Sequence, residues 1–428
     1  MLLLVDIEKI KNFAIIGGGI MGSGIAQVAL LSGYEKVTVI DLNSIILNNS
    51  RKLVKSRIEA LESEEKCKEY FASNEMLKSL DFKKKLGSFE SVGIVANKVD
   101  TKTIMNRLYT ETEISKGVKD ADFVIEAVTE KLELKKGIFK QLGEFTPPQA
   151  VLASNTSSMS ITKIAELCKR PNKVIGFHHH TFFPITGMLI EITPGEKSSE
   201  ESLEIGYSVA QKFPCITGKR FTVRLEKEFD GLIANRITLP IQIYFDWLID
   251  YANSNGFTMD QLGVLQMAFI IADSVGVDTL YNIMVYFEKY VSPDFAPGKY
   301  LEKLINSGRL GKKVGKGFYD WNEDGSIKNP PSIDENALKF LEEHLKEEIF
   351  LAIQFNEACR VLEKGVVKNY RLIDKVIFKG TSSPGIFRTG KDKYKEWVKI
   401  LYKVAEKTGK SYLKPCNMME SGKFLTLR

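Results

Sequence analysis

A glycine-rich turn between a short apolar strand and a helix constrains this chain more than any other feature. Gly17, Gly19 and Gly22 follow the strand-like run Phe13–Ile16 in the spacing GxGxxG. In such a turn the first glycine permits a tight bend, the second lets the backbone approach a pyrophosphate, and the third lets the helix pack on the strand. The amino end of the helix then attracts the phosphates. The sequence therefore predicts a dinucleotide site at this turn.

The expected cofactor site extends to the residues around the turn. Ile20 and Met21 open the helix, and Asp41 ends the next apolar strand, nineteen residues after Gly22. A carboxylate at that position accepts hydrogen bonds from the ribose and repels an additional 2′-phosphate, so Asp41 favours NAD over NADP. The alternative is a glycine turn that binds nothing, with Asp41 as a solvated strand end.

The pattern of elements changes once along the chain. Up to about residue 224, strands alternate with helices, which predicts a doubly wound, mostly parallel sheet. Beyond that point strands become scarce, and a long apolar helix is expected at Leu232–Ala252. Asn-Pro-Pro-Ser at 329–332 has the composition of a linker. We therefore expect an α/β fold followed by all-α parts. The predicted domains are a Rossmann-type NAD-binding domain at 1–228 and two helical units at 229–330 and 331–428.

Composition narrows the class of protein. A hydrophobic content of 44% and a charged content of 27% are typical of a globular chain, and no apolar stretch reaches the ~20 residues of a membrane span. Asp6 and Glu8 interrupt the opening residues, so we expect no signal peptide. Five dispersed cysteines without a CxxC pair favour a cytoplasmic location and no metal site. The net charge of +6 comes with no base-reading motif, so we expect no nucleic-acid partner.

Histidines are the candidates for acid–base chemistry, because histidine titrates nearest neutrality. The chain has four histidines, and three of them are consecutive: His178, His179 and His180. If the preceding strand continues through them, His178 and His180 share one face and His179 points to the other. The fourth, His344, lies in a charged helix and is expected to be solvated. Strand alternation alone leaves the choice of base open.

Six short motifs are spread along the chain. They are Gly-Gly-Gly-Ile-Met-Gly-Ser-Gly-Ile-Ala (17–26), Val-Ile-Glu-Ala-Val-Thr-Glu (124–130), Ser-Asn-Thr-Ser-Ser (154–158), Gly-Phe-His (176–178), Asn-Arg (235–236) and Gly-Lys-Lys-Val-Gly-Lys-Gly-Phe-Tyr-Asp (311–320). These motifs resemble those of the 3-hydroxyacyl-CoA dehydrogenase family. The resemblance implies NAD-dependent oxidation of 3-hydroxyacyl-CoA to 3-oxoacyl-CoA in fatty-acid metabolism such as β-oxidation, with an acyl-CoA thioester as substrate. It also implies helical C-terminal units of the 6-phosphogluconate-dehydrogenase type, the last being similar to the extra domain of the longer, multifunctional members.

The resemblance also implies roles for individual residues. It places the catalytic base on His178, its carboxylate partner on Glu191, and contacts to the substrate oxygen on Ser157 and Asn235. Each has a simpler alternative: Ser157 as a helix cap, Asn235 as a helix-start residue, and Glu191 as an ordinary strand residue. The resemblance further implies Glu130, Lys135, Ser157 and Lys313 for NAD, and Thr181, Ser157 and Ser56 for the substrate. As isolated charges, Glu130, Lys135 and Lys313 would be surface residues.

The histidine segment departs from the family pattern. Family members usually have His-Phe-Phe-Asn-Pro, whereas this chain has His-His-His-Thr-Phe-Phe-Pro at 178–184, with Thr181 in place of the asparagine. One extra residue precedes Glu191, and counting back from Glu191 selects His179 as the base. In a strand, one inserted residue moves a side chain by about 3.3 Å and reverses its face, unless a bulge absorbs it.

Two alternatives to the family activity follow from this departure. One is a non-catalytic NAD-binding protein of the same fold, and the other is a dehydrogenase of a free hydroxy acid. For the assembly we expect a monomer or a homodimer. Family members often dimerise through a helical unit, and the second helical unit of this chain could cover the same apolar face internally.

Overall fold

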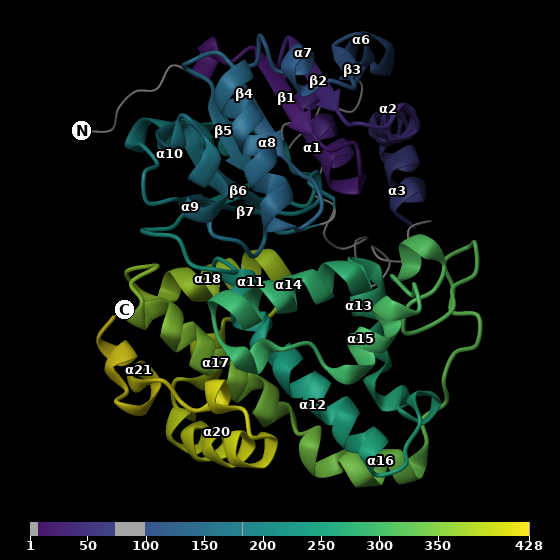
Figure 1. Ribbon diagram of the computed structural model, residues 1–428, viewed down its shortest axis with the longest axis vertical. Helices are drawn as coiled ribbons and strands as arrows, with labels where there is room; N and C mark the ends of the chain where they lie inside the picture. The colour runs from purple at the N-terminus through teal and green to yellow at the C-terminus, as the bar shows by residue number, and fades with distance from the viewer. Residues whose placement is uncertain (1–6, 73–98, 182, 428) are drawn as a thin grey trace. The chain divides into compact units, whose positions relative to one another are not determined.

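The computed structural model describes residues 7–72, 99–181 and 183–427 (Figure 1). The segment Gly87–Lys98, whose conformation the sequence leaves ambiguous, lies outside these residues. The chain divides into two compact units. The first comprises Met1–Leu232 with Phe378–Ser382, and the second comprises Ile233–Ile377 with Ser383–Arg428. The division into three domains stays a prediction.

The first unit is built on one eight-stranded sheet in the order β3-β2-β1-β4-β5-β6-β7-β8. Every neighbouring pair is parallel except β6 with β7. The order reverses between β1 and β4, the point at which such sheets bind ligands beyond the carboxyl ends of their strands. The predicted doubly wound, mostly parallel sheet is thus confirmed. The strands are β1 (Asn12–Ile16), β2 (Lys36–Ile40), β3 (Leu108–Glu111), β4 (Phe123–Glu126), β5 (Val151–Ser154), β6 (Val174–His179), β7 (Leu189–Pro194) and β8 (Phe221–Arg224).

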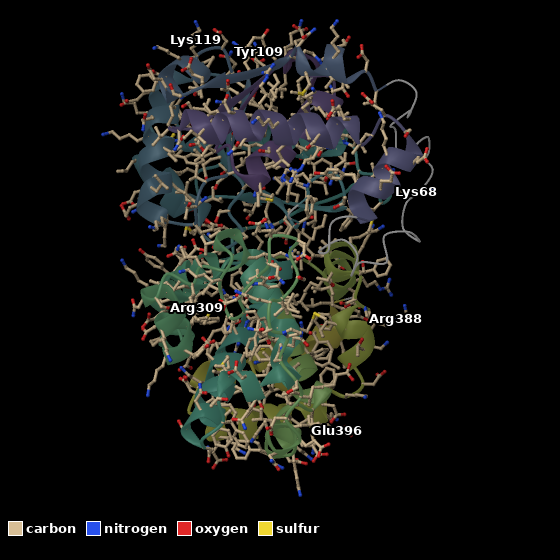
Figure 2. The ribbon with its side chains drawn as sticks, turned by 90° about the vertical axis from the view of Figure 1, so that its right-hand side faces the viewer. Lys68, Tyr109, Lys119, Arg309, Arg388 and Glu396 are labelled. Atoms are coloured by element: carbon tan, nitrogen blue, oxygen red, sulfur yellow. The ribbon has the colours of Figure 1, made fainter. Side chains whose placement is uncertain are left out.

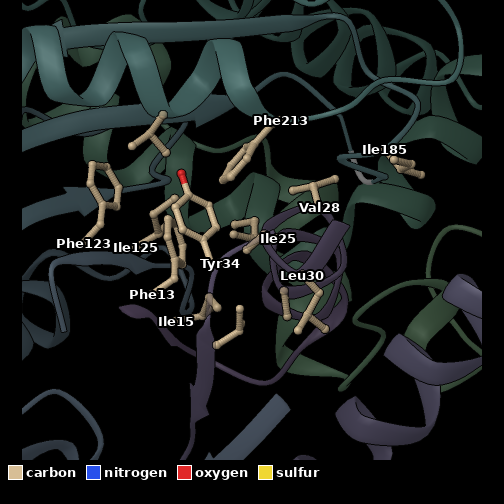
Figure 3. Packing of buried hydrophobic residues seen from close by; sticks show 14 of the residues in the cluster. Phe13, Ile15, Ile25, Val28, Leu30, Tyr34, Phe123, Ile125, Ile185 and Phe213 are labelled. Carbon is tan, nitrogen blue, oxygen red and sulfur yellow. The ribbon is translucent and has the colours of Figure 1, made fainter. Parts of the chain in front are cut away.

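One face of the sheet carries the main hydrophobic core. Alternate strand residues on this face pack against the helices α1, α2 and α10, and Figure 3 shows part of this packing around Phe13 and Tyr34. Each fully buried aliphatic or aromatic side chain contributes about 1.5–3 kcal/mol. The strand residues in the core are Phe13, Ile15, Val37, Val39, Phe123, Ile125, Val151, Ala153, Ile175, Phe177, Ile190 and Ile192.

The opposite face becomes polar toward the ends of the central strands. The strand positions that alternate with the core residues point to this opposite face, and they include Glu126, Ser154, His178 and Glu191. All four are buried. Buried polar groups are stable only when hydrogen-bonded, so this face is where a functional site is expected. The helices of the unit are α1 (Ile20–Leu31), α2 (Ser44–Glu59), α3 (Glu64–Ala72), α6 (Thr101–Met105), α7 (Ile114–Gly117), α8 (Leu132–Phe145), α9 (Ile161–Ile164) and α10 (Glu200–Lys212).

From Ile233 onward the described chain contributes helices. The long helix expected at 232–252 is divided at Pro240, which cannot donate a backbone hydrogen bond and therefore begins a new helix. The helix α17 packs against α11, α12, α19, α20 and α21. The helices are α11 (Ala234–Thr238), α12 (Pro240–Ser254), α13 (Gln266–Val275), α14 (Val277–Tyr290), α15 (Lys299–Asn306), α16 (Glu335–Leu341), α17 (Glu347–Glu363), α18 (Tyr370–Thr381), α19 (Ile386–Gly390), α20 (Tyr394–Thr408) and α21 (Asn417–Glu420).

The surfaces of both units carry charged side chains, among them Lys68 and Lys119 in the first unit and Arg388 and Glu396 in the second (Figure 2). Within the described ranges, no helix is by itself long and apolar enough to cross a bilayer. The turn and helix at 263–275 reach the length and hydropathy of a membrane span only when α14 is added, and α14 is bent by 91° relative to them.

Candidate active site

The glycine turn after β1 has the geometry that its sequence predicts. Gly17 has a φ of +109°, and a Cβ there would lie 2.6 Å from the carbonyl oxygen of Ala127. A Cβ on Gly22 would lie 1.8 Å from the carbonyl oxygen of Gly17, so these two positions require glycine. A Cβ on Gly19 would meet nothing within 4 Å. The turn is therefore closed on its protein side and open at Gly19.

The amino end of α1 is also suited to an anion. Gly19 is its N-cap residue and supplies no side-chain hydrogen bond to the first turn. Ile20 and Met21 occupy that turn, and Ile20 is exposed. Backbone N–H groups at the start of a helix have no partner within the helix and attract a phosphate.

Asp41 lies beside the turn, as expected. It follows β2, and its Oδ2 accepts a hydrogen bond of 2.9 Å from the backbone N–H of Gly18. Its Oδ1 accepts a bond of 3.3 Å from the N–H of Asn43. These contacts hold the carboxylate at the carboxyl end of β2, where the ribose of a dinucleotide is bound in folds of this type.

Glu130 and Lys135 belong to a buried ionic network. The Nζ of Lys135 lies 2.6 Å from Glu126 Oε1 and 3.3 Å from Glu130 Oε2, and its side chain is 1% exposed. Burial lowers the pKa of Lys135, but the two carboxylates outweigh it and raise the pKa above its ordinary value. Lys135 thus holds Glu126 and Glu130 together instead of presenting its charge to solvent.

The same network holds the polar loop after β5. Glu130 Oε1 accepts hydrogen bonds of 2.9 Å from the backbone N–H of Ser157 and from the hydroxyl of Thr156. Glu126 Oε2 accepts a bond of 2.6 Å from the hydroxyl of Ser154. The structure therefore brings Glu130, Lys135 and Ser157 into one cluster at the carboxyl ends of β4 and β5.

His178 and Glu191 form a buried pair on the neighbouring strands. They are directly opposite each other in the antiparallel pairing of β6 with β7. His178 Nδ1 lies 2.9 Å from Glu191 Oε2, and both side chains are buried. With Nδ1 donating to the carboxylate, the other ring nitrogen, Nε2, carries the lone pair that can accept a proton.

The extra residue in the histidine segment does not displace this pair. The β6–β7 register runs without interruption from Ile175 opposite Pro194 to His179 opposite Ile190. The segment 180–188 that connects the two strands therefore absorbs the extra residue. Counting back from Glu191 selects His179, whereas the residue that lies opposite Glu191 in the pairing is His178.

The other two histidines of the triplet have different surroundings. His179 points into the apolar core, stacks on Phe213 and shares the Oδ1 of Asn155 between its backbone N–H and its Nδ1. Burial, with Arg220 and His178 adding to it, lowers the pKa of His179 well below its usual value. The pKa of His180 is lowered to about 4, mainly by burial and also by His178, while Glu191 acts to raise it. Both rings are therefore neutral at pH 7.

The remaining predicted residues belong neither to the His178–Glu191 pair nor to the ionic network of Lys135. Thr181 closes a local turn by accepting a hydrogen bond of 3.0 Å from the N–H of Phe183. Ser56 lies on α2 and donates to the carbonyl of Leu53. Asn235 on α11 and Lys313 belong to the second unit, where Lys313 Nζ pairs with Asp278 at 2.6 Å. The nearest partner of Lys313 is thus a carboxylate of its own unit.

Arg220 is a positioning residue that the sequence analysis missed. Its guanidinium donates to the carbonyls of Phe213, Pro184, Gly187 and Pro214. It thereby fixes the connection between β6 and β7 that absorbs the extra residue. Its position just before the short strand β8 gives no sequence signal for this role. Glu126, by contrast, has a sequence signal for a functional position, because it is a lone acid at the end of an otherwise apolar strand.

A Rossmann-type sheet with an open glycine turn, a carboxylate at the end of the second strand and a buried histidine–glutamate pair is typical of a nicotinamide-dependent oxidoreductase. Models of the NAD-binding domain of 3-hydroxyacyl-CoA dehydrogenase match residues 12–100 and 81–220, and the model of its C-terminal domain matches 231–321. The chain belongs to the 3-hydroxyacyl-CoA dehydrogenase family. It is an NAD-dependent dehydrogenase of 3-hydroxyacyl-CoA in fatty-acid metabolism, as the sequence predicted.

Individual relatives agree with this assignment. A probable 3-hydroxybutyryl-CoA dehydrogenase of Deinococcus radiodurans is 30% identical over 316 residues, covering 72% of this chain and 100% of the relative. The fatty acid oxidation complex subunit alpha of Vibrio vulnificus is 28% identical over 427 residues, covering 96% of this chain and 54% of the relative. The crystal structure of 3-hydroxybutyryl-CoA dehydrogenase from Escherichia coli K12 shares the fold, with a TM-score of 0.68, 22% identity, and coverage of 98% and 99% of the two chains.

Proposed function

We propose that His178 is the base that accepts the hydroxyl proton of the 3-hydroxyacyl-CoA, while Glu191 stabilises the imidazolium that forms. The observation that carries this proposal is the 2.9 Å contact between His178 Nδ1 and Glu191 Oε2. A buried carboxylate that accepts from Nδ1 fixes the tautomer and orientation of the ring. His179 and His180 are less suited, because their environments oppose protonation.

NAD, when bound, supplies the acceptor for the hydride that leaves C3 of the substrate. Gly17, Gly19 and Gly22 are proposed to seat the pyrophosphate at the start of α1, with Ile20 and Met21 alongside. Asp41 is proposed to hold the ribose hydroxyls. These proposed roles are supported by the open side of the turn at Gly19 and by the Asp41 carboxylate, which is hydrogen-bonded to the turn.

The reacting oxygen needs hydrogen-bond donors, since it gains negative charge as the proton leaves. Ser157 is proposed as one donor. Its backbone is already fixed by Glu130, and its hydroxyl lies 3.4 Å from the same carboxylate. The family resemblance assigns a second donor, Asn235, and NAD and substrate contacts to Lys313, Thr181 and Ser56. These assignments remain predictions.

We propose a short-chain thioester, of the 3-hydroxybutyryl-CoA type, as the substrate class to test first. The support is the name of the relative from Deinococcus radiodurans. The experiment compares NAD reduction with 3-hydroxybutyryl-CoA, with a long-chain 3-hydroxyacyl-CoA, and with free 3-hydroxybutyrate. Turnover restricted to thioesters supports the proposal. Turnover of the free acid alone would favour a hydroxy-acid dehydrogenase, and NADH binding without turnover would favour a non-catalytic protein.

A cytoplasmic location and the state of assembly are also proposed. Five buried cysteine thiols fit the reducing cytoplasm. For assembly we propose a monomer, or a homodimer that does not use α12. Within the second unit α17 covers α11 and α12, and Arg236 Nε lies 2.6 Å from Glu357 Oε1. Light scattering tests this, and a dimer that is broken by substitutions on α12 would contradict it.

A further inference from the structure

Two histidines and a glutamate of the first unit converge on one point. His178 and His180 are two residues apart on the same side of the chain, and Glu191 lies opposite His178. One nitrogen of each ring and one oxygen of Glu191 all lie within 4.8 Å of one another. The proposed proton transfer uses His178 and Glu191 and leaves His180 without a role.

These side chains form a donor set of known preference. Two imidazoles and a carboxylate are the ligands of many catalytic and structural sites for Zn²⁺ and other first-row divalent cations. With metal–ligand distances of about 2.0–2.2 Å, a tetrahedral ion separates its ligand atoms by roughly 3.4 Å. His178 Nδ1 and Glu191 Oε2 are 2.9 Å apart, and the ligand nitrogen of His180 lies within 4.8 Å, so it must approach the pair when an ion binds.

We propose that His178, His180 and Glu191 bind a divalent cation such as Zn²⁺, and that the bound ion blocks dehydrogenation. A cation bound to Nδ1 of His178 moves the ring proton to Nε2, so that Nε2 can no longer accept one, and it also occupies the carboxylate of Glu191. The blocking effect rests on the proposed function of His178, whereas the binding of the ion does not. The alternative donor, His179, is excluded because it faces the core and contacts Asn155.

Cysteine spacing, which predicted no metal site, gives no sign of this donor set. The set forms because antiparallel pairing places a glutamate across from one of two histidines on a shared face. The third ligand, His180, lies in the segment where this chain departs from the family pattern. We therefore expect the sensitivity to metal to be a property of this chain.

The test uses the full-length protein and has two readouts. The first is the visible absorption of Co²⁺ added to the protein, with Zn²⁺ as competitor. The second is NADH oxidation by acetoacetyl-CoA with and without Zn²⁺. We expect one tightly bound Co²⁺ per chain, displacement by Zn²⁺, loss of turnover at matching Zn²⁺ concentrations, and recovery after a chelator is added.

Two variants, His180→Asn and His180→Phe, each remove the His180 ligand and replace it with a different side chain. Both are expected to weaken Co²⁺ binding by at least about tenfold and to restore turnover in Zn²⁺, while NADH binding shows that they are folded. His344→Gln, which removes the histidine of the second unit, serves as the control and is expected to change neither readout. Equal Zn²⁺ sensitivity in wild type and His180→Asn would overturn the proposal, as would the lack of stoichiometric Co²⁺ absorption.

The two readouts separate this inference from the proposed function. Co²⁺ binding that depends on His180, in a protein without turnover, supports the metal site and contradicts the catalytic role of His178. Turnover that is insensitive to Zn²⁺, in a protein that shows no Co²⁺ absorption, contradicts only the metal site.

Discussion

His178 and Glu191 face each other across the β6–β7 pair, with His178 Nδ1 2.9 Å from Glu191 Oε2. Because both side chains come from paired strands, the backbone register fixes their separation. This arrangement preorganises the proposed base before any substrate arrives, which is what an efficient proton acceptor requires.

Glu191→Gln keeps the size of the side chain and removes its charge. We expect turnover to fall by about 10²- to 10⁴-fold, because the imidazolium loses its carboxylate partner. NADH affinity should be unchanged. Glu196→Gln, an exposed substitution just after the same strand, is the matched control and should behave as wild type. Wild-type turnover in Glu191→Gln would remove Glu191 from the mechanism.

Gly19→Ala tests the nucleotide turn without disturbing the fold. The added Cβ meets no protein atom within 4 Å, and the backbone angles of −71° and −168° suit alanine. We expect normal stability and a loss of NADH affinity of about tenfold, or ~1.4 kcal/mol. Fluorescence titration of NADH measures it.

Gly137→Ala in α8 is the control for this change. Its Cβ also meets nothing within 4 Å, and it should gain about 1 kcal/mol of helix stability with no effect on NADH. Unchanged NADH affinity in Gly19→Ala would mean that the pyrophosphate does not lie over the turn.

Lys135→Met tests the buried ionic network. Removing the ammonium leaves Glu126 charged and 0% exposed, so we expect the free energy of unfolding to fall by about 3–5 kcal/mol. Lys140→Met, an exposed substitution on the same helix, should change it by less than about 0.5 kcal/mol. Denaturant unfolding of both variants measures the difference, and equal stability would show that Lys135 does not hold the carboxylates.

Asp246 on α12 provides a prediction about pH. Burial is the main cause that raises the pKa of Asp246 from 3.8 to about 6, and the nearby charge of Asp250 also raises this pKa. Hydrogen bonds from Gln242 and the N–H of Gly298, and the charge of Lys410, lower it in part. Because the folded state binds the proton more tightly than the unfolded state, the stability due to this group is complete below pH ~4 and is lost as the pH rises to ~6. The loss amounts to about 3 kcal/mol at most.

Asp246→Asn removes this titration while keeping an acceptor for Gly298. We expect the stability of the variant to vary less between pH 4 and 6 than that of the wild type, as measured by urea unfolding across that range. An unchanged slope would mean that Asp246 is solvated in the folded protein.

The sequence was sufficient for the parts of the fold that depend on local patterns. The glycine spacing predicted the turn and α1, and alternating strands and helices predicted the sheet. Strand alternation correctly separated His179 from His178 and His180, because side-chain direction in a strand follows from position alone.

What the sequence did not predict depends on contacts between distant segments. Arg220 binds two carbonyls of the connection at 180–188 and two at 213–214, and nothing near Arg220 in the sequence indicates this. Lys135 read equally well as a surface charge, since its burial depends on two carboxylates from other positions. The break before Pro240 was visible in the sequence but was outweighed by the apolar run around it.

The most direct test of this account is the turnover of His178→Gln with acetoacetyl-CoA and NADH, measured alongside its NADH affinity. The account predicts that turnover falls by at least about 10²-fold while NADH affinity stays at the wild-type value, because the proposed base is lost and the nucleotide turn is intact. Turnover close to wild type in His178→Gln would contradict it.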